Sequence, residues 1–171
     1  MAGRTLLIAA LIVGLVPTAF AQLSNRDKTF VMNAAQAINY QIRAALLVDK
    51  YSSNQVYRDY AIRVANEQTE ESGELQFMVA DEDTSVRLPS GVSPTGQRQL
   101  DALKNARNVD TTYRNQTIAS LGAMLSLYQT YAGQFDANPQ LKKMAQEMLP
   151  IIQKELDDAT NLLTTAQYVK P

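Results

Sequence analysis

The stretch SNRDKTFVMNAAQAINYQIRAALLVDKY (residues 24–51) carries the pattern on which the fold of this 171-residue chain depends. Its apolar residues recur at intervals of three and four, which is the period of an α-helix, and they do not alternate as in a strand. Ser24 stands where an N-cap is expected, and Asp27 falls in the first turn, where a negative charge is favourable. We expect a helix over residues 25–51 whose inward stripe comprises Phe30, Val31, Ala34, Ala35, Ile38, Ile42, Ala45, Leu46 and Val48.

A short turn, Ser52-Ser53-Asn54, follows this helix, so the next one, expected over residues 55–83, must run back antiparallel to it. Either Ser53 or Asn54 can cap it. Its inward stripe is predicted to comprise Val56, Tyr57, Tyr60, Ala61, Val64, Leu75, Phe77, Met78 and Val79. The stripe is interrupted in the middle, because polar Gln68 and Glu71 occupy the positions that would continue it. This gap is the most informative irregularity of the chain.

The rest of the chain predicts three further helices, over residues 97–106, 110–135 and 139–168. They follow a loop, residues 84–95, that contains Pro89, Gly91 and Pro94 and is long enough to cross one end of a bundle. Pro150 falls inside the last helix, but the apolar stripe keeps its phase through it, which predicts one kinked helix rather than two. The fold class is therefore all-α: a ferritin-like antiparallel four-helix bundle with a short extra helix in the crossover between the second and third long helices.

Residues 1–21 read as a signal peptide. Arg4 precedes an apolar stretch from Leu6 to Val16, and small residues at Ala19 and Ala21 suit signal peptidase. The alternative is a retained anchor, but the apolar stretch is shorter than the roughly 17–25 residues that span a bilayer. We expect cleavage between Ala21 and Gln22, a periplasmic or secreted product, and a single helical domain over residues 22–171.

The composition excludes several classes of protein. The chain has no histidine and no cysteine, so it cannot build a Ser-His-Asp triad, a thiol nucleophile, a disulfide or a zinc site with Cys or His ligands. Its formal net charge of −1 offers no basic face for the phosphates of a nucleic acid. We expect a protein that is not an enzyme, carries no cofactor and binds no nucleic acid.

Four short motifs resemble those of a known family. They are Phe30-Val31-Met32-Asn33-Ala34-Ala35, Tyr60-Ala61 with Val64-Ala65, Val109-Asp110-Thr111-Thr112-Tyr113, and Leu141-Lys142 with Ala145 and Leu149-Pro150. Their order and spacing resemble the exported bacterial group called "domain of unknown function 4142", whose pattern includes F-V-x-x-A-A, F-A-x-x-M-V, F-D-x-x-Y and L-K-x-x-A-x-x-x-L-P. The match extends over residues 24–168. The resemblance implies a signal peptide, a ferritin-like bundle and an envelope location, and it implies no particular activity.

The chain departs from this pattern at the family's imidazoles. Relatives often carry His at three helix positions where this sequence has Gln68, Leu121 and Glu155, and a frequent Glu on the first helix aligns with Gln41. Any role of those histidines, metal binding included, therefore does not transfer to this chain residue by residue.

The second helix nevertheless concentrates carboxylates at Glu67, Glu70, Glu71 and Glu74. Glu67, Glu71 and Glu74 share neighbouring surface, and Glu155 from the last helix could approach them. One interpretation is a hard-cation site with Gln41 and Gln68 as further ligands. The other is a polar layer in which Glu71 reaches Gln68 or Gln41 and fixes the helix register. We favour the layer, comprising Gln41, Glu67, Gln68, Glu71 and Glu155, and expect no metal.

The resulting hypothesis is a non-enzymatic exported protein of the bacterial envelope that acts through an unknown protein or envelope partner, in an interaction or stress-related role. It can form a homo-oligomer, and it has no membrane span after cleavage. A carboxylate-based metal-binding protein is the first alternative. The second is a bundle that binds a small amphiphile, for which Tyr57, Tyr60, Tyr128 and Tyr131 could line a groove.

Overall fold

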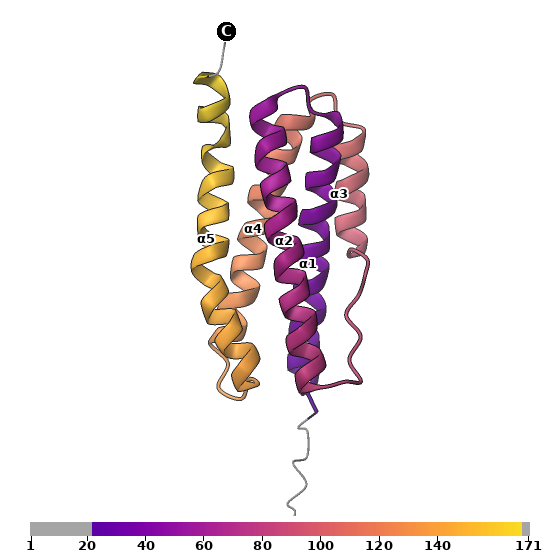
Figure 1. Cartoon of the computed structure of the whole chain (residues 1–171), viewed down its shortest axis with the longest axis vertical. Coiled ribbons are helices and arrows are strands. Elements are labelled where there is room, and N and C mark those ends of the chain that lie inside the picture. Colours follow the sequence, from indigo (N-terminus) through magenta and orange to yellow (C-terminus); the bar gives the residue numbers. More distant parts are fainter. Residues whose placement is uncertain (1–21, 169–171) are drawn as a thin grey trace, which may run out of the picture.

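The computed structural model describes residues 22–168, with side chains described as far as residue 162. It contains α1 (Asn25–Tyr51), α2 (Gln55–Glu82), α3 (Pro94–Lys104), α4 (Val109–Ala132) and α5 (Pro139–Tyr168). The long helices α1, α2, α4 and α5 form the bundle, and the short α3 packs outside it against α1 and α4 (Figure 1). The predicted signal peptide and its cleavage site between Ala21 and Gln22 lie outside the described residues or at their edge.

The long helices form a ring in the order α1, α2, α5, α4, and each runs antiparallel to both of its neighbours (Figure 1). A bundle of this kind needs one long crossover, because α2 and α4 run in the same direction. The segment between α2 and α4, which includes α3, is that crossover. The predicted ferritin-like antiparallel four-helix bundle with an extra helix in the crossover is confirmed. Within residues 22–168, no helix combines the length and the apolar character needed to cross a bilayer.

Polar caps set the helix ends. The hydroxyl of Ser24 accepts a hydrogen bond from the Asp27 backbone N–H (3.1 Å), and the Asp27 carboxylate accepts one from the Ser24 N–H (3.0 Å), which is a capping box. Asn54 caps α2 through the N–H of Val56 (3.0 Å). Helix α2 ends at Glu82 rather than at the expected residue 83, because Asp83 is extended and forms the C-cap.

The boundaries of two other helices also differ from those predicted. Helix α3 covers residues 94–104 instead of 97–106, because the Ser93 hydroxyl accepts a hydrogen bond from Gly96 N (3.0 Å) and thereby places Pro94 at the first helical position. Helix α4 covers residues 109–132 instead of 110–135, since Asn108 caps its start and Gly133 ends it. Helix α5 passes through Pro150 as one element, over the expected residues 139–168.

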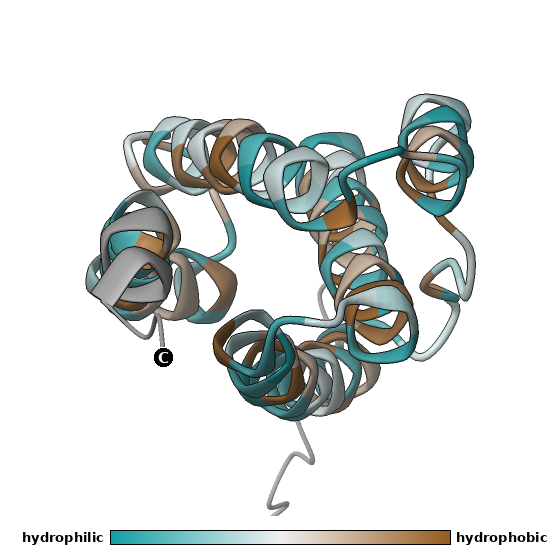
Figure 2. Ribbon diagram, turned by 90° about the horizontal axis from the view of Figure 1, so that it is seen from above, coloured by the Kyte–Doolittle hydropathy of each residue, from teal (hydrophilic) through white to brown (hydrophobic). Residues whose placement is uncertain are grey.

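Apolar side chains from all five helices are buried. Figure 2 shows the ring of helices from above, with hydrophobic and hydrophilic residues along each of them. Two residues predicted to face inward do not. Leu46 is 56% exposed and Phe77 is 77% exposed. Each residue turns the helix by about 100°, so Leu46 points away from its buried neighbour Ala45, and Phe77 lies about 200° from the buried Leu75.

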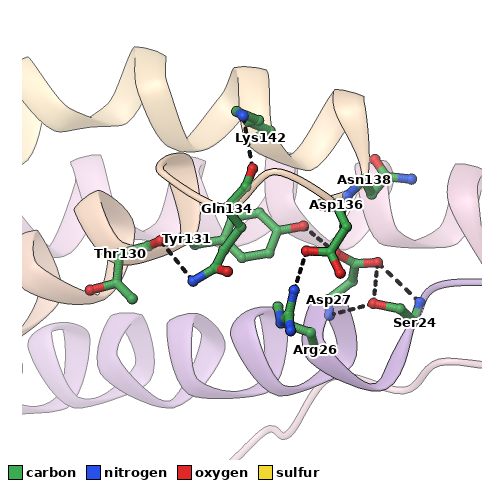
Figure 3. A network of polar contacts seen from close by, with 9 residues as sticks. All are labelled: Ser24, Arg26, Asp27, Thr130, Tyr131, Gln134, Asp136, Asn138 and Lys142. Carbon is green, nitrogen blue, oxygen red and sulfur yellow. Dashed lines mark hydrogen bonds and ion pairs between the residues drawn. The ribbon is translucent and has the colours of Figure 1, made fainter.

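The carboxylate of Asp27 joins three chain segments at one end of the bundle (Figure 3). Besides the cap of Ser24, it accepts hydrogen bonds from the Tyr131 hydroxyl of α4 (2.5 Å) and from the backbone N–H of Asn138 before α5 (3.1 Å). Burial raises the pKa of Asp27, but the hydrogen bonds from Ser24, Tyr131 and Asn138 outweigh burial and hold the pKa below its usual value. The group therefore stays ionised and fixes α1, α4 and α5 to one another.

A second buried aspartate lies at the same end. Asp83 accepts hydrogen bonds from the Leu23 backbone N–H (3.2 Å) and from the Ser85 side chain (2.6 Å), and it pairs with Lys28 of α1 (3.1 Å). The start of the described chain is thereby attached to the end of α2.

We predict that Asp27→Ala lowers the free energy of unfolding by about 3 kcal/mol, because it leaves the Tyr131 hydroxyl and the Asn138 N–H without their acceptor. Urea denaturation measures the change. Asp136→Ala is the matched control: Asp136 pairs with Arg26 on the surface, and the loss of such a pair changes stability by less than about 1 kcal/mol. Equal effects of the two substitutions would contradict the role given to Asp27.

Candidate functional site

The polar gap in the sequence of α2 becomes a buried layer between α2, α4 and α5. The amide Nε2 of Gln68 donates to both carboxylate oxygens of Glu155 on α5, at 3.2 Å each. The hydroxyl of Tyr128 on α4 donates to Glu71 Oε1 at 2.8 Å. Gln68 is 1% exposed, Glu71 6% and Glu155 3%. Two acidic side chains therefore lie inside the bundle, each held by a neutral hydrogen-bond donor from another helix.

Both carboxyl groups titrate far from their usual range. Burial raises the pKa of Glu71 to about 7; the hydrogen bond from Tyr128 opposes this shift, and the charge of nearby Glu155 adds to it. Burial likewise raises the pKa of Glu155 to about 7, against the hydrogen bond from Gln68 and with the charge of Glu67. Below neutral pH the protonated forms prevail, so the fold can enclose the pair without enclosing two charges.

Several buried polar atoms of the layer have no hydrogen-bond partner among the described residues. Gln41 of α1 is fully buried, and neither atom of its amide meets a hydrogen-bond partner within residues 22–162. In the same part of the chain, Glu71 Oε2 and Gln68 Oε1 also have none. A buried polar atom without a partner costs about 1–3 kcal/mol, so the layer lowers stability while it restricts how the helices can align.

Charged side chains border the layer where α2 faces α5. Arg63 binds Glu67 on its own helix (3.1 Å) and Asp158 on α5 (3.0 Å), and Asp158 also binds Lys154 (2.9 Å). The guanidinium of Arg63 lies over the ring of Tyr60, 5.1 Å from its centre. The Arg63–Asp158 pair joins α2 to α5 at the edge of the bundle, and Asp158 lies within one turn of Glu155.

The structure divides the five residues proposed for the layer. It brings Gln68, Glu71 and Glu155 together, buries Gln41 with no hydrogen-bond partner among residues 22–162, and turns Glu67 outward to Arg63. Glu70 and Glu74 are exposed. Sequence reasoning did not connect Tyr128 to the layer and named it as a residue that could line a ligand groove. A signal was available, because a buried tyrosine hydroxyl needs a partner and a buried carboxyl needs a donor.

Nowhere among the described residues do three or more acidic side chains converge closely enough to hold a metal ion. The carboxylate-only cation site that the sequence left open would need such a cluster. What Glu71 and Glu155 can do chemically is bind and release protons near neutral pH.

These features define the class: an all-α, ferritin-like bundle with an acidic pair in its interior. The chain belongs to the family described as "Domain of unknown function (DUF4142)", which it matches over residues 15–162. The resemblance drawn from the four sequence motifs is thereby confirmed.

Among solved structures, the fold is similar to that of a DUF305 fragment from Deinococcus radiodurans. The TM-score is 0.69 at 15% sequence identity, and the match covers 84% of this chain and 99% of that one. At this identity the likeness concerns the fold alone. No protein with a curated annotation matches the sequence.

We predict that the protein is more stable at about pH 5 than at about pH 8. The folded state raises the pKa of Glu71 and Glu155 above the unfolded value, so their contribution is fully present below the unfolded pKa of about 4.5 and is lost as the pH rises through about 7. Each shift corresponds to about 3 kcal/mol, and the two are coupled. The chain has no histidine, so few other groups titrate in this window. Thermal melting across this pH range measures the effect.

Glu71→Gln and Glu155→Gln should each flatten this pH dependence and raise the melting temperature at about pH 8, because a neutral amide replaces a group that must otherwise ionise inside the bundle. Glu70→Gln is the matched control, since Glu70 is exposed and adjacent in sequence. The assignment is refuted if the melting temperature of the wild type does not decrease from about pH 5 to about pH 8. It is also refuted if Glu70→Gln flattens the pH dependence as much as the other two substitutions.

Proposed function

We propose that this protein is an exported, non-catalytic interaction protein of the bacterial envelope. One observation carries the proposal: the two carboxyl groups with the most useful pKa for acid–base chemistry, Glu71 and Glu155, are only 6% and 3% exposed. A general acid or base must come within hydrogen-bond distance of its substrate. Groups enclosed between helices and engaged by Tyr128 and Gln68 serve the architecture of the bundle instead.

The start of the folded body supports export with cleavage. Leu23 is 4% exposed, its backbone N–H binds Asp83, and the cap of α1 follows at Ser24. The expected cut between Ala21 and Gln22 would therefore leave one exposed residue ahead of the fold, and removal of the signal peptide would disturb none of these contacts.

The test is made in a bacterium that naturally carries the protein. Cell fractionation and intact-mass measurement should find a chain that begins at Gln22 in the envelope fraction. Chemical cross-linking in intact cells, followed by mass spectrometry, should then give a discrete product that contains an envelope protein. A chain retained in the cytoplasm, or one that cross-links to nothing in the envelope, would contradict the proposal.

A second candidate function is the binding of a small amphiphile, which a hollow between α1 and α4 favours. It measures about 370 Å³, within the range of small-molecule sites, and Phe30, Leu127 and Tyr131 form its apolar part. The rings of Phe30 and Tyr131 are stacked with centres 3.8 Å apart. Polar side chains line the rest, among them Arg26, Thr130 and Gln134 (Figure 3).

The remaining tyrosines proposed for such a groove, Tyr57, Tyr60 and Tyr128, are buried in the core.

If the hollow binds amphiphiles, dodecanoate should raise the melting temperature of the wild type, and Leu127→Gln should abolish the rise. Leu125→Gln is the matched control, because Leu125 is also half-buried on α4 but does not line the hollow. No rise in the wild type, or the same loss in both variants, would exclude this function.

A further inference from the structure

The outer face of α2 presents an aromatic side chain to solvent. Phe77 is 77% exposed and lies in the C-terminal part of α2, whose other face is buried. It borders a hollow of about 530 Å³ at the junction of α2 with the start of α5. The hollow is lined by Gly73, Glu74, Phe77, Met78, Asp81 and Glu82 of α2 and by Gln140 of α5.

Acidic residues surround Phe77 on this helix face. Glu74 and Asp81 lie three residues before and four residues after it, and Glu70 lies one turn further back, so all three share its side of α2. Among the described residues, no lysine or arginine lines the hollow. Among the described side chains, none of the ion pairs involves Glu70, Glu74 or Asp81. The face thus combines an exposed apolar group with uncompensated negative charge.

Gly73 leaves the space beside Phe77 open. A methyl group added to Gly73 would meet no atom of the described residues within 4 Å, so close packing does not require glycine here. Glycine inside a helix costs about 1 kcal/mol relative to alanine. The same residue deepens the hollow by lacking a side chain.

We propose that this acidic face of α2, defined by Glu70, Gly73, Glu74, Phe77 and Asp81, docks a basic amphipathic helix of a partner protein. An apolar side chain of the partner enters the hollow beside Gly73 and packs on Phe77, and lysine or arginine side chains flanking it pair with the carboxylates. The inference rests on the proposed interaction function and names the chemistry of the partner.

Charge complementarity selects this occupant over two others. Anionic lipid headgroups would be repelled by three carboxylates around the apolar group. A second copy that met this face with its own matching face would bring carboxylates against carboxylates, because Glu70, Glu74 and Asp81 are exposed there. A basic helix of about three turns matches the distance from Glu70 to Asp81, since each residue adds about 1.5 Å along the axis.

The experiment measures fluorescence anisotropy of a labelled amphipathic Leu–Lys helix of about four turns, titrated with the protein purified from the envelope fraction. A peptide of the same length with Glu in place of Lys is the charge control. We expect the Lys peptide to bind, more weakly as salt increases, and the Glu peptide not to bind. Phe77→Ala and Gly73→Leu should each weaken binding of the Lys peptide at least about tenfold, equal to about 1.4 kcal/mol.

Two matched variants separate a local effect from a general one. Ile62→Ala removes another exposed apolar side chain of α2, and Gly122→Leu fills another helical glycine with open space around it, on α4. Neither residue lines the hollow, and both variants should bind like the wild type. Gly73→Leu should not lower the melting temperature, because it improves helix propensity and its Cβ meets no atom of the described residues within 4 Å.

Unchanged binding in Phe77→Ala and Gly73→Leu overturns the proposal, as does equal weakening in the two controls. Loss of binding to phosphatidylglycerol vesicles in Phe77→Ala would assign the face to lipid, and loss of a wild-type dimer in the same variant would assign it to a second copy; both results also overturn it. A cross-linked envelope partner that is unaffected by these substitutions leaves the proposed function intact and refutes only the docking site. If the Lys peptide binds specifically but no envelope partner is cross-linked, the proposed function is refuted and the docking site stands.

Discussion

The structure depends on the burial of two carboxyl groups between helices that are distant in sequence. Glu71 and Glu155 can lie inside the bundle only if they are protonated or hydrogen-bonded, and Tyr128 and Gln68 supply the donors. Each donor comes from a different helix than its acceptor, so α2, α4 and α5 must align to satisfy both bonds. A shift of α5 along α2 by one turn would separate Gln68 from Glu155 and leave a polar group buried without its partner. Apolar packing holds the helices together, and this polar layer favours one alignment among those that packing alone allows.

The middle and the end of the bundle respond to pH in opposite directions. At the end, Asp27 has a lowered pKa, and its ionised carboxylate on α1 accepts hydrogen bonds from Tyr131 and Asn138. Its contribution is lost in acid. In the middle, Glu71 and Glu155 have raised pKa values, and their contribution is lost as the pH rises through neutrality. The two effects together place maximum stability at mildly acidic pH.

Helix α2 connects the interior of the protein with the surface proposed for its function. Its inward face contributes Gln68 and Glu71 to the buried layer, and its outward face presents Phe77 between Glu74 and Asp81. The glutamates that looked like one cluster in the sequence therefore have separate roles: Glu71 is structural, Glu67 pairs with Arg63, and Glu70 and Glu74 remain available for contact with a partner. A residue at i and one at i+3 share a helix side only approximately, and the neighbouring helices decide which of them is enclosed.

The sequence by itself determined the helices, their order and the N-caps of the first two. Helical periodicity, Ser24 and Asn54 are local signals that act within one or two turns, and the polar gap at Gln68 and Glu71 indicated an interior layer with Gln41 and Glu155 as candidate partners. Only the tertiary structure decided that Tyr128 donates to Glu71, that Asp27 accepts a hydrogen bond from Tyr131, and that Phe77 lies outside. It also decided that Gln41 is buried with no hydrogen-bond partner among the described side chains. The reason is geometric: periodicity gives the direction of a side chain around its own helix axis. The axial offset and rotation between helices, which select its partner, arise from the packing of all four together.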